Sequence, residues 1–107
     1  MSADAASGAT QPAPVRLALP GALADVVGGR RHVDISLDGA TATLADVLDR
    51  VDADLPALAR RLRDEQGQLR RHVNVYVDGD DVRRGEGLAT LVPPGAEVLV
   101  LPSVAGG

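Results

Sequence analysis

The order in which two kinds of apolar periodicity follow one another constrains the fold more than any other feature of this sequence. Apolar residues alternate with other residues at 15–19, 33–37 and 73–77, which is the pattern of half-buried strands. Between the second and third of these segments, residues 44–51 carry apolar side chains at helical spacing. A continuous apolar run at residues 98–101 comes last. The sequence therefore predicts a pair of strands, a helix and then further strands.

Turn signals separate these segments. A Pro-Gly pair at residues 20–21 ends the first strand, and an Asp-Gly pair at residues 38–39 ends the second. Residues 21–30 are expected to form a loop, across which the first two strands pair as a hairpin. A second Asp-Gly pair, at residues 78–79, predicts another hairpin that leads into a short strand.

The helix boundaries are marked as well. Asp46 follows Thr43 by three residues, a pattern similar to a capping box in which Asp replaces the usual Glu or Gln. Pro56 is placed to begin a second, shorter helix. The second helix is expected to turn Leu55, Leu58 and Leu62 inward and Arg60, Arg61 and Arg63 outward. The arginine clusters, including the pair at residues 70–71, are interpreted as solvated surface.

This order of elements predicts the fold class. A crossover connection between parallel strands is right-handed, which places the last strand beside the first. The expected architecture is an α+β domain in which one main helix crosses a mixed sheet, as in the β-grasp or ubiquitin-like fold. We assign residues 1–14, which are small, polar and proline-bearing, to a disordered leader. The domain would occupy residues 15–101, and a flexible tail would occupy residues 102–107.

Composition argues against several kinds of chemistry. The chain has no cysteine and its eleven basic residues are all arginine, so its side chains offer no thiol nucleophile, no thiolate metal ligand and no Schiff-base lysine. A net charge of -4 and a single aromatic residue, Tyr76, argue against nucleic-acid binding. The sequence shows neither a membrane-length apolar run nor a secretory signal, so we expect a cytoplasmic protein without a membrane partner.

Polar residues that could support catalysis or bind a metal lack the spacing that these functions need. His32 and His72 occupy positions opposite the predicted core face and are expected to be exposed. The acidic run at residues 78–81 lacks the glycine and the distal glutamate of an EF-hand loop, so we interpret it as a solvated hairpin turn. Ser36 and Ser103 show no nucleophile-elbow context. We therefore predict no catalytic residue and no bound metal.

The chain closes on Gly106-Gly107, shortly after its last apolar run. Two residues without a Cβ allow an extended tail to enter a narrow channel and to turn in either sense. This ending favours a protein whose C-terminal carboxylate is its working group and is acted on by other enzymes. The alternative is a plain disordered end.

Three segments of the second half of the chain point to a known family. They are V-N-V-Y-V-D-G-D-D-V-R, which begins at Val73, G-L-A-T, which begins at Gly87, and the ending L-P-S-V-A-G-G. Together they resemble the ubiquitin-like sulfur carriers of the MoaD/ThiS family, and most closely the CysO-type carriers of actinobacteria. The first half, from about Val15, agrees by pattern alone. Pro102 counts against the ThiS subtype, whose tail usually lacks this proline.

The resemblance implies a protein cosubstrate and not an enzyme. In this family an ATP-dependent, E1-like enzyme adenylates the C-terminal carboxylate, here that of Gly107, and the acyl-adenylate is exchanged for a thiocarboxylate that donates sulfur. The residues that would thread into the partner's site are Pro102, Ser103, Val104, Ala105 and Gly106. The carrier itself would bind no cofactor.

The subtype decides which further partners the resemblance implies. A CysO-type carrier gives its sulfur to a PLP-dependent cysteine synthase that uses O-phosphoserine, and a zinc peptidase then releases cysteine from the terminal glycine. A MoaD-type carrier is the small subunit of molybdopterin synthase, with its tail inside the large subunit. A ubiquitin-like conjugation or interaction module is the third hypothesis. PLP and zinc would belong to the partners and not to this chain.

The last strand is apolar on both sides. Val98 and Val100 would face the core, whereas Leu99 and Leu101 would face the other way, near Tyr76. One interpretation is a central strand that is covered on both faces. The other, which we favour, is an exposed apolar strip that docks the activating enzyme.

Overall fold

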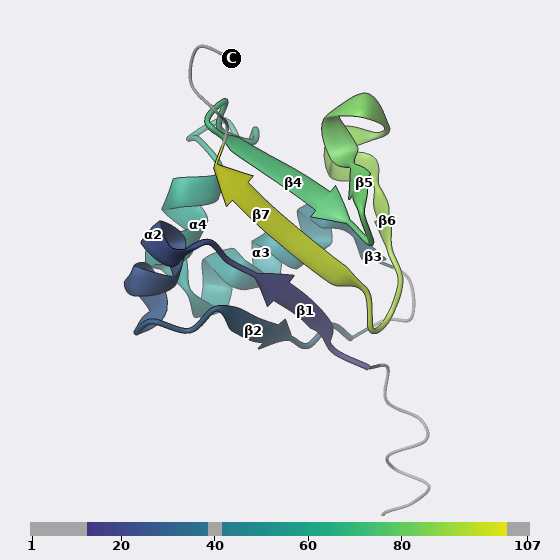
Figure 1. The fold of residues 1–107 in the computed structure, drawn as a ribbon. Coiled ribbons are helices and arrows are strands. Elements are labelled where there is room, and N and C mark those ends of the chain that lie inside the picture. The colour runs from purple at the N-terminus through teal and green to yellow at the C-terminus, as the bar shows by residue number, and fades with distance from the viewer. Residues whose placement is uncertain (1–12, 39–41, 103–107) are drawn as a thin grey trace, which may run out of the picture.

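A mixed five-stranded sheet organises the part of the chain that the computed structural model describes, residues 13–38 and 42–102 (Figure 1). Its strands are β1 (Val15–Ala18), β2 (His32–Ile35), β4 (Val73–Val77), β5 (Asp80–Asp81) and β7 (Glu97–Pro102). Their order across the sheet is β2-β1-β7-β4-β5, in which β1 and β7 are parallel and the other neighbours are antiparallel. The last strand therefore lies beside the first, as predicted, and both predicted hairpins are confirmed.

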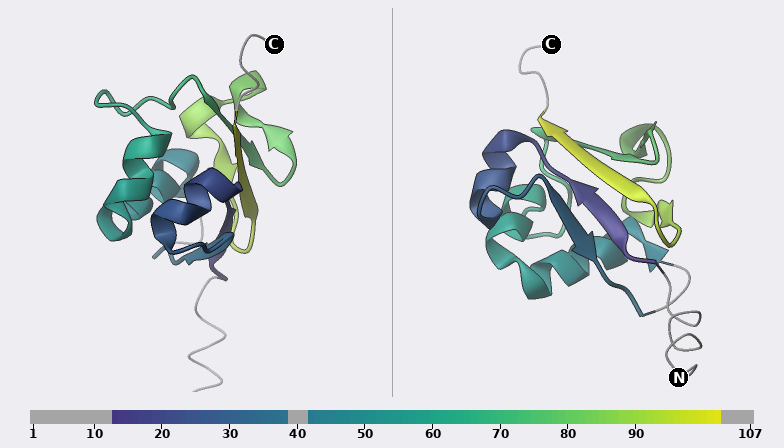
Figure 2. Two further views of the ribbon diagram at one scale, coloured as in Figure 1. Left: turned by 60° about the vertical axis from the view of Figure 1, so that its left-hand side comes forward. Right: turned by 60° about the horizontal axis from the view of Figure 1, so that its bottom comes forward.

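Two helices, α3 (Leu44–Asp54) and α4 (Pro56–Leu62), pack against one face of this sheet (Figure 1, Figure 2). The predicted capping box begins α3. The N–H of Asp46 donates to Oγ1 of Thr43 at 3.2 Å, and the N–H of Thr43 donates to Oδ2 of Asp46 at 2.9 Å. Pro56 begins α4, as predicted. Within the described residues, no helix is long and apolar enough to cross a bilayer.

Replacing Thr43 by alanine is expected to lower the free energy of unfolding by about 1 kcal/mol, because the N–H of Asp46 loses its side-chain acceptor. Urea denaturation followed by circular dichroism measures this change. Thr43→Ser keeps the hydroxyl and is the matched control, with a stability close to that of the wild type. Equal stability of the alanine and serine variants would show that the capping box contributes nothing in solution.

The core between the sheet and the helices is aliphatic. Its largest fully buried side chains are Leu17, Leu44, Leu48, Leu58 and Leu62, and valines of β1, α3, β4 and β7 fill the space between them. Leu55, also predicted to face inward, packs at the margin of this cluster. Among the described residues, none that is polar or charged is buried. The sheet and the helices thus share one core, formed by the apolar stripes that the sequence predicts.

Residues 21–30 are not the simple loop that the sequence predicts. They contain a four-residue helix, α2 (Gly21–Ala24), and a 3-10 turn, η1 (Asp25–Val27). Ala24 is buried against the core, and Gly28 ends the segment in the left-handed conformation, with a φ of 74°. The prediction of a loop was therefore wrong. A helix this short has no apolar period that a sequence could show, and its burial in the fold stabilises it.

A second, two-stranded sheet was not predicted either. It pairs β3 (Ala42–Thr43) with β6 (Leu91–Val92) in antiparallel orientation. Two short 3-10 helices, η2 (Val82–Arg84) and η3 (Gly87–Ala89), connect β5 to β6. The second of them gives residues 87–89 a single helical turn.

Candidate functional site

The candidate site begins at Pro102, where β7 ends. The N–H of Asp78 donates to the carbonyl of Glu97 at 2.9 Å, and the N–H of Glu97 donates back to Oδ1 of Asp78, so this pair stands at a hydrogen-bonding position of the β4–β7 ladder. Pair types alternate along an antiparallel ladder, which makes Val73 and Pro102 a non-hydrogen-bonded pair. The ring nitrogen of Pro102 therefore faces away from β4, and the missing N–H removes no bond between these two strands. This register allows β7 to end on a proline that still pairs with Val73.

The structure fixes the point from which the tail leaves the domain. Pro102 is exposed, and β7 is the central strand of the five and not an edge strand. The other residues predicted to thread into a partner, Ser103, Val104, Ala105 and Gly106, lie outside the described residues, as does Gly107. Residues 1–12 of the predicted leader lie outside them too.

The three residues predicted to dock a partner share one side of the sheet, which we call the outer face. Tyr76 of β4 lies directly opposite Leu99 of β7, and Leu101 follows on the same side with 39% of its surface exposed. Val98 and Val100 point the other way and are fully buried. In Figure 1, β4 and β7 turn the outer face toward the viewer, with α3 and α4 behind the sheet. The placement of these three residues on one side of the sheet agrees with the predicted apolar strip. The role of the strip in docking stays a prediction.

Charged residues occupy the outer face at β1 and β2, which lie on the side of β7 away from β4. Arg16 of β1 and Asp34 of β2 are register partners, with 3.7 Å between Nε and Oδ1. Both side chains are 58% exposed, so this ion pair contributes little to stability. The outer face thus carries Tyr76, Leu99 and Leu101 together with the polar Asn74 and Glu97 on β4 and β7, and charged residues on β1 and β2.

One residue near the base of the tail was missed by the sequence analysis. The guanidinium group of Arg83, in η2, donates hydrogen bonds to backbone carbonyls at the start of β4, beside the strand end that carries Pro102. In the sequence Arg83 closes the segment V-N-V-Y-V-D-G-D-D-V-R that carries the family resemblance, but no spacing places it beside the tail. Only the folded arrangement brings the two together.

The histidines and acidic residues considered as catalytic or metal candidates are separated or have structural roles. His32 in β2 and His72 before β4 are both exposed, as predicted. Asp78 and Gly79 have φ values of 48° and 92° and form the turn of the β4–β5 hairpin. Oδ1 of Asp78 also accepts the N–H of Glu97 at 2.9 Å. Within residues 13–38 and 42–102, no three histidine or acidic side chains are grouped to hold a metal ion.

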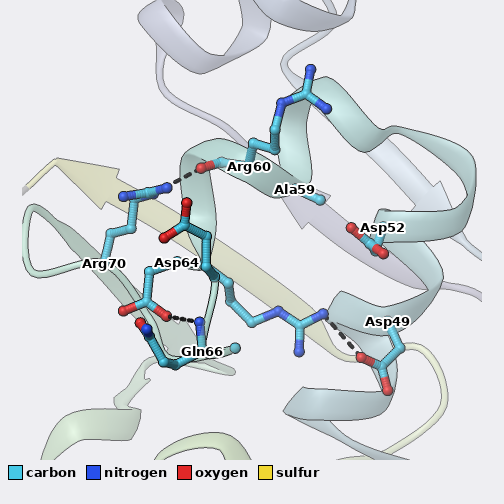
Figure 3. A pocket seen from close by; sticks show the side chains of 10 residues that line it. Asp49, Asp52, Ala59, Arg60, Asp64, Gln66 and Arg70 are labelled. Atoms are coloured by element: carbon cyan, nitrogen blue, oxygen red, sulfur yellow. Dashed lines mark hydrogen bonds and ion pairs between the residues drawn. The ribbon is translucent and has the colours of Figure 1, made fainter.

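A separate hollow of about 520 Å³ lies among α3, α4 and the connection to β4 (Figure 3). An ion pair and a side-chain-to-backbone hydrogen bond cross its lining. Nη2 of Arg63 donates to Oδ1 of Asp49 at 2.9 Å, and Nε of Arg70 donates to the carbonyl of Arg60 at 2.7 Å. The prediction that Arg63 faces outward was wrong, because this ion pair with α3 leaves its side chain only 16% exposed. The lining carries carboxylate and guanidinium groups side by side and favours no particular ligand.

Comparison with known proteins identifies relatives over most of the chain. The ThiS family model matches residues 17–107. The sulfur carrier protein CysO of Mycobacterium tuberculosis is 39% identical over 95 residues, which cover 87% of this chain and 98% of that protein. Small archaeal modifier protein 1 of Haloferax volcanii is 38% identical over 81 residues, which cover 76% of this chain and 87% of that protein.

A solved structure of a CysO protein is also similar to this chain. The match within the crystal structure of the Amycolatopsis orientalis BexX/CysO complex has a TM-score of 0.72 and 35% identity, and covers 87% of this chain and 99% of that chain. The β-grasp fold and the resemblance to CysO-type carriers are confirmed by this likeness and by the CysO relative. Because the family match runs through nearly the whole domain and to the last residue, the chain belongs to the ThiS family.

Proposed function

We propose that this chain is a sulfur carrier, a protein cosubstrate whose reactive group is the carboxylate of Gly107. The observation that carries the proposal is the 39% identity to CysO of M. tuberculosis over 98% of that protein, together with a family match that extends to residue 107. An E1-like enzyme would transfer AMP from ATP to the carboxylate and release pyrophosphate. A sulfur donor would then displace AMP and leave a thiocarboxylate on Gly107.

The side-chain chemistry of the chain is consistent with this proposal. A carboxylate is a weak electrophile, and adenylation supplies the leaving group that it lacks. The thiocarboxylate is ionised at neutral pH and is a good nucleophile. Since the chain has neither cysteine nor lysine, its side chains offer no thiol or amine to compete for the activated end. ATP would be used by the activating enzyme, and the carrier would contribute only its own carboxyl group.

The geometry of the tail base supports the same proposal. Five residues follow Pro102, and an extended chain of that length spans roughly 17 Å. The carboxylate of Gly107 could therefore reach well beyond the sheet into the active site of a partner. The outer face lies beside this exit, because Leu101 immediately precedes Pro102. We infer that the activating enzyme docks on Tyr76, Leu99 and Leu101 and receives the tail in an adjacent channel.

The direct test uses the absence of cysteine. The chain is incubated with ATP, an E1-like enzyme and a sulfur donor, treated with iodoacetamide, and analysed by intact mass spectrometry. We expect one label per chain, and none when ATP is omitted. The label is needed because oxidation of Met1 changes the mass almost as much as replacement of oxygen by sulfur. No label, from an enzyme set that is active on another carrier, would contradict the proposal.

For the sulfur acceptor we propose the CysO route to cysteine, on the strength of the same identity to CysO. A PLP-dependent synthase would join the thiocarboxylate to the three-carbon unit derived from O-phosphoserine, and a zinc peptidase would release cysteine. The test is to add such a synthase with O-phosphoserine to the thiocarboxylated chain. We expect an adduct heavier than the carrier by one cysteine residue. Stable copurification with a molybdopterin synthase large subunit would favour the MoaD-type alternative.

Conjugation to other proteins is a second candidate function, which the identity to small archaeal modifier protein 1 favours. In this case the carboxyl group of Gly107 would form an isopeptide bond with lysines of target proteins. The last arginine is Arg84, so trypsin would leave residues 85–107 on the target lysine and not a short di-glycine remnant. Finding that branched peptide in cells would support conjugation, whereas finding only the cysteine adduct would support the carrier route.

A further inference from the structure

Within residues 13–38 and 42–102, no strand lies beside the outer edge of β4 over most of its length. β5 pairs only with Tyr76 and Val77 and then gives way to η2. Because Val73 and Pro102 form a non-hydrogen-bonded pair, the N–H and carbonyl of Val73 point away from β7 toward this edge. The end of β4 that lies opposite the tail base therefore needs hydrogen-bond partners from outside the sheet.

Arg83 supplies the missing donor. Its Nη2 donates to the carbonyl of Val73 at 2.8 Å and to the carbonyl of Arg70 at 2.7 Å. The N–H of Val73 donates to that same carbonyl of Arg70 at 3.2 Å, so three backbone groups and one guanidinium form a single cluster. The backbone of Arg83 is itself fixed, because its N–H donates to Oδ1 of Asp81 at 2.9 Å.

The segment that Arg83 holds is also tied to α4. The N–H of Arg70 donates to the carbonyl of Leu62 at 2.9 Å, and Nε of Arg70 donates to the carbonyl of Arg60 at 2.7 Å. Residues 70–73 are therefore held by α4 on one side and by η2 on the other. Val73 in turn lies opposite Pro102, the last residue of β7. Hydrogen bonds thus connect Arg83 to Val73, and the register of β4 and β7 places Val73 opposite the base of the tail.

We propose that Arg83 is a positioning residue for the C-terminal tail. By holding Val73, it fixes the register partner of Pro102 and so the position of the strand end from which the tail begins. This inference rests on the proposed function, in which the carboxylate of Gly107 must meet ATP inside a partner. A shift of Pro102 displaces the point from which the tail must reach the partner's site, and displacement of a reacting group by about 1 Å can slow a reaction about a hundredfold.

The test compares Arg83→Met with Arg84→Met in the full chain. Arg84 is the adjacent arginine, is exposed, and makes no side-chain hydrogen bond or ion pair with any residue in the described ranges, so its variant removes the same charge without removing the contacts. ATP–pyrophosphate exchange is measured with an E1-like enzyme at increasing carrier concentration. For Arg83→Met we expect kcat to fall about tenfold with KM changed less than twofold, because docking on the outer face is intact. For Arg84→Met we expect both constants to match the wild type.

Each other outcome has a defined meaning. An unchanged kcat for folded Arg83→Met would overturn the inference and leave the sulfur-carrier proposal intact. A raised KM with an unchanged kcat would make Arg83 a docking contact and would also overturn it. If Arg83→Met does not fold, Arg83→Lys keeps the charge and a donor, and we expect a kcat between those of the wild type and the tenfold loss. No exchange with the wild-type chain would instead count against the proposed function.

Discussion

A chain that lacks Gly107 is expected to take up no iodoacetamide label in the sulfur-transfer assay. Removing one residue withdraws the carboxylate by about 3.5 Å along an extended tail, which is far more than an adenylating site tolerates. We expect the rate of labelling to fall by at least about a hundredfold. Because β7 ends at Pro102, five residues before Gly107, the melting temperature should stay that of the full chain. Intact mass spectrometry and thermal denaturation of the same sample measure both quantities.

A deletion at the other end of the chain is the matched control. It removes residues 1–12 and stops there, because the carbonyl of Ala13 accepts the N–H of Gly95 at 3.2 Å. We expect this shortened chain to be labelled at the wild-type rate. Normal labelling of the chain without Gly107 would contradict the proposal that this carboxylate carries the sulfur. A large loss from the N-terminal deletion would show that the leader contacts the activating enzyme.

Replacing Leu101 by aspartate is expected to raise the KM of the activating enzyme for the carrier about tenfold, with a smaller effect on kcat. Leu101 is the most exposed of the three residues expected to dock a partner, and a charge there would have to be desolvated on docking. A tenfold change corresponds to about 1.4 kcal/mol, which is within the range of a single interface anchor. Steady-state kinetics of pyrophosphate exchange at varied carrier concentration measure this change.

Leu91→Asp is the control for this variant. Leu91 is 63% exposed, more than Leu101, but it belongs to the two-stranded sheet of β3 and β6 and not to the outer face. It therefore introduces the same charge at an exposed leucine away from the expected docking surface. Equal increases in KM for the two variants would mean that net charge, and not the outer face, decides docking. An unchanged KM for Leu101→Asp would remove this face from the proposed interface.

The elements with the clearest periodicity could be predicted from the sequence. Residues 44–51 carry four buried apolar positions behind a capping box, and this combination of cap and stripe identified both the start and the inner face of α3. The alternation at residues 73–77 likewise gave β4 with its burial pattern. The order of these elements then determined the place of β7, because a right-handed crossover leaves one position for it.

The elements that were missed are too short to have a period, or depend on contacts between distant parts of the chain. α2 has four residues, and β3 and β6 have two each, so burial and pairing in the folded domain define them. The inward turn of Arg63 needs Asp49, which comes from the preceding helix. Arg83 reaches the carbonyl of Val73 because β5 ends at Asp81 and the chain turns into η2, and this arrangement exists only in the folded domain. At the candidate site, the sequence indicated the tail and the apolar strip of the last strand. It did not indicate Arg83, which we propose positions the tail.

The aliphatic core and the position of Tyr76 have a practical consequence for spectroscopy. Tyr76 is the only Phe, Trp or Tyr in the chain, and it lies on the outer face beside Leu99. Its ring resonances, and any emission excited near 280 nm from the free carrier, therefore originate from that surface alone. The chain consequently carries a built-in, single-site optical and magnetic reporter at the face that we expect partners to cover, and a titration needs no added label.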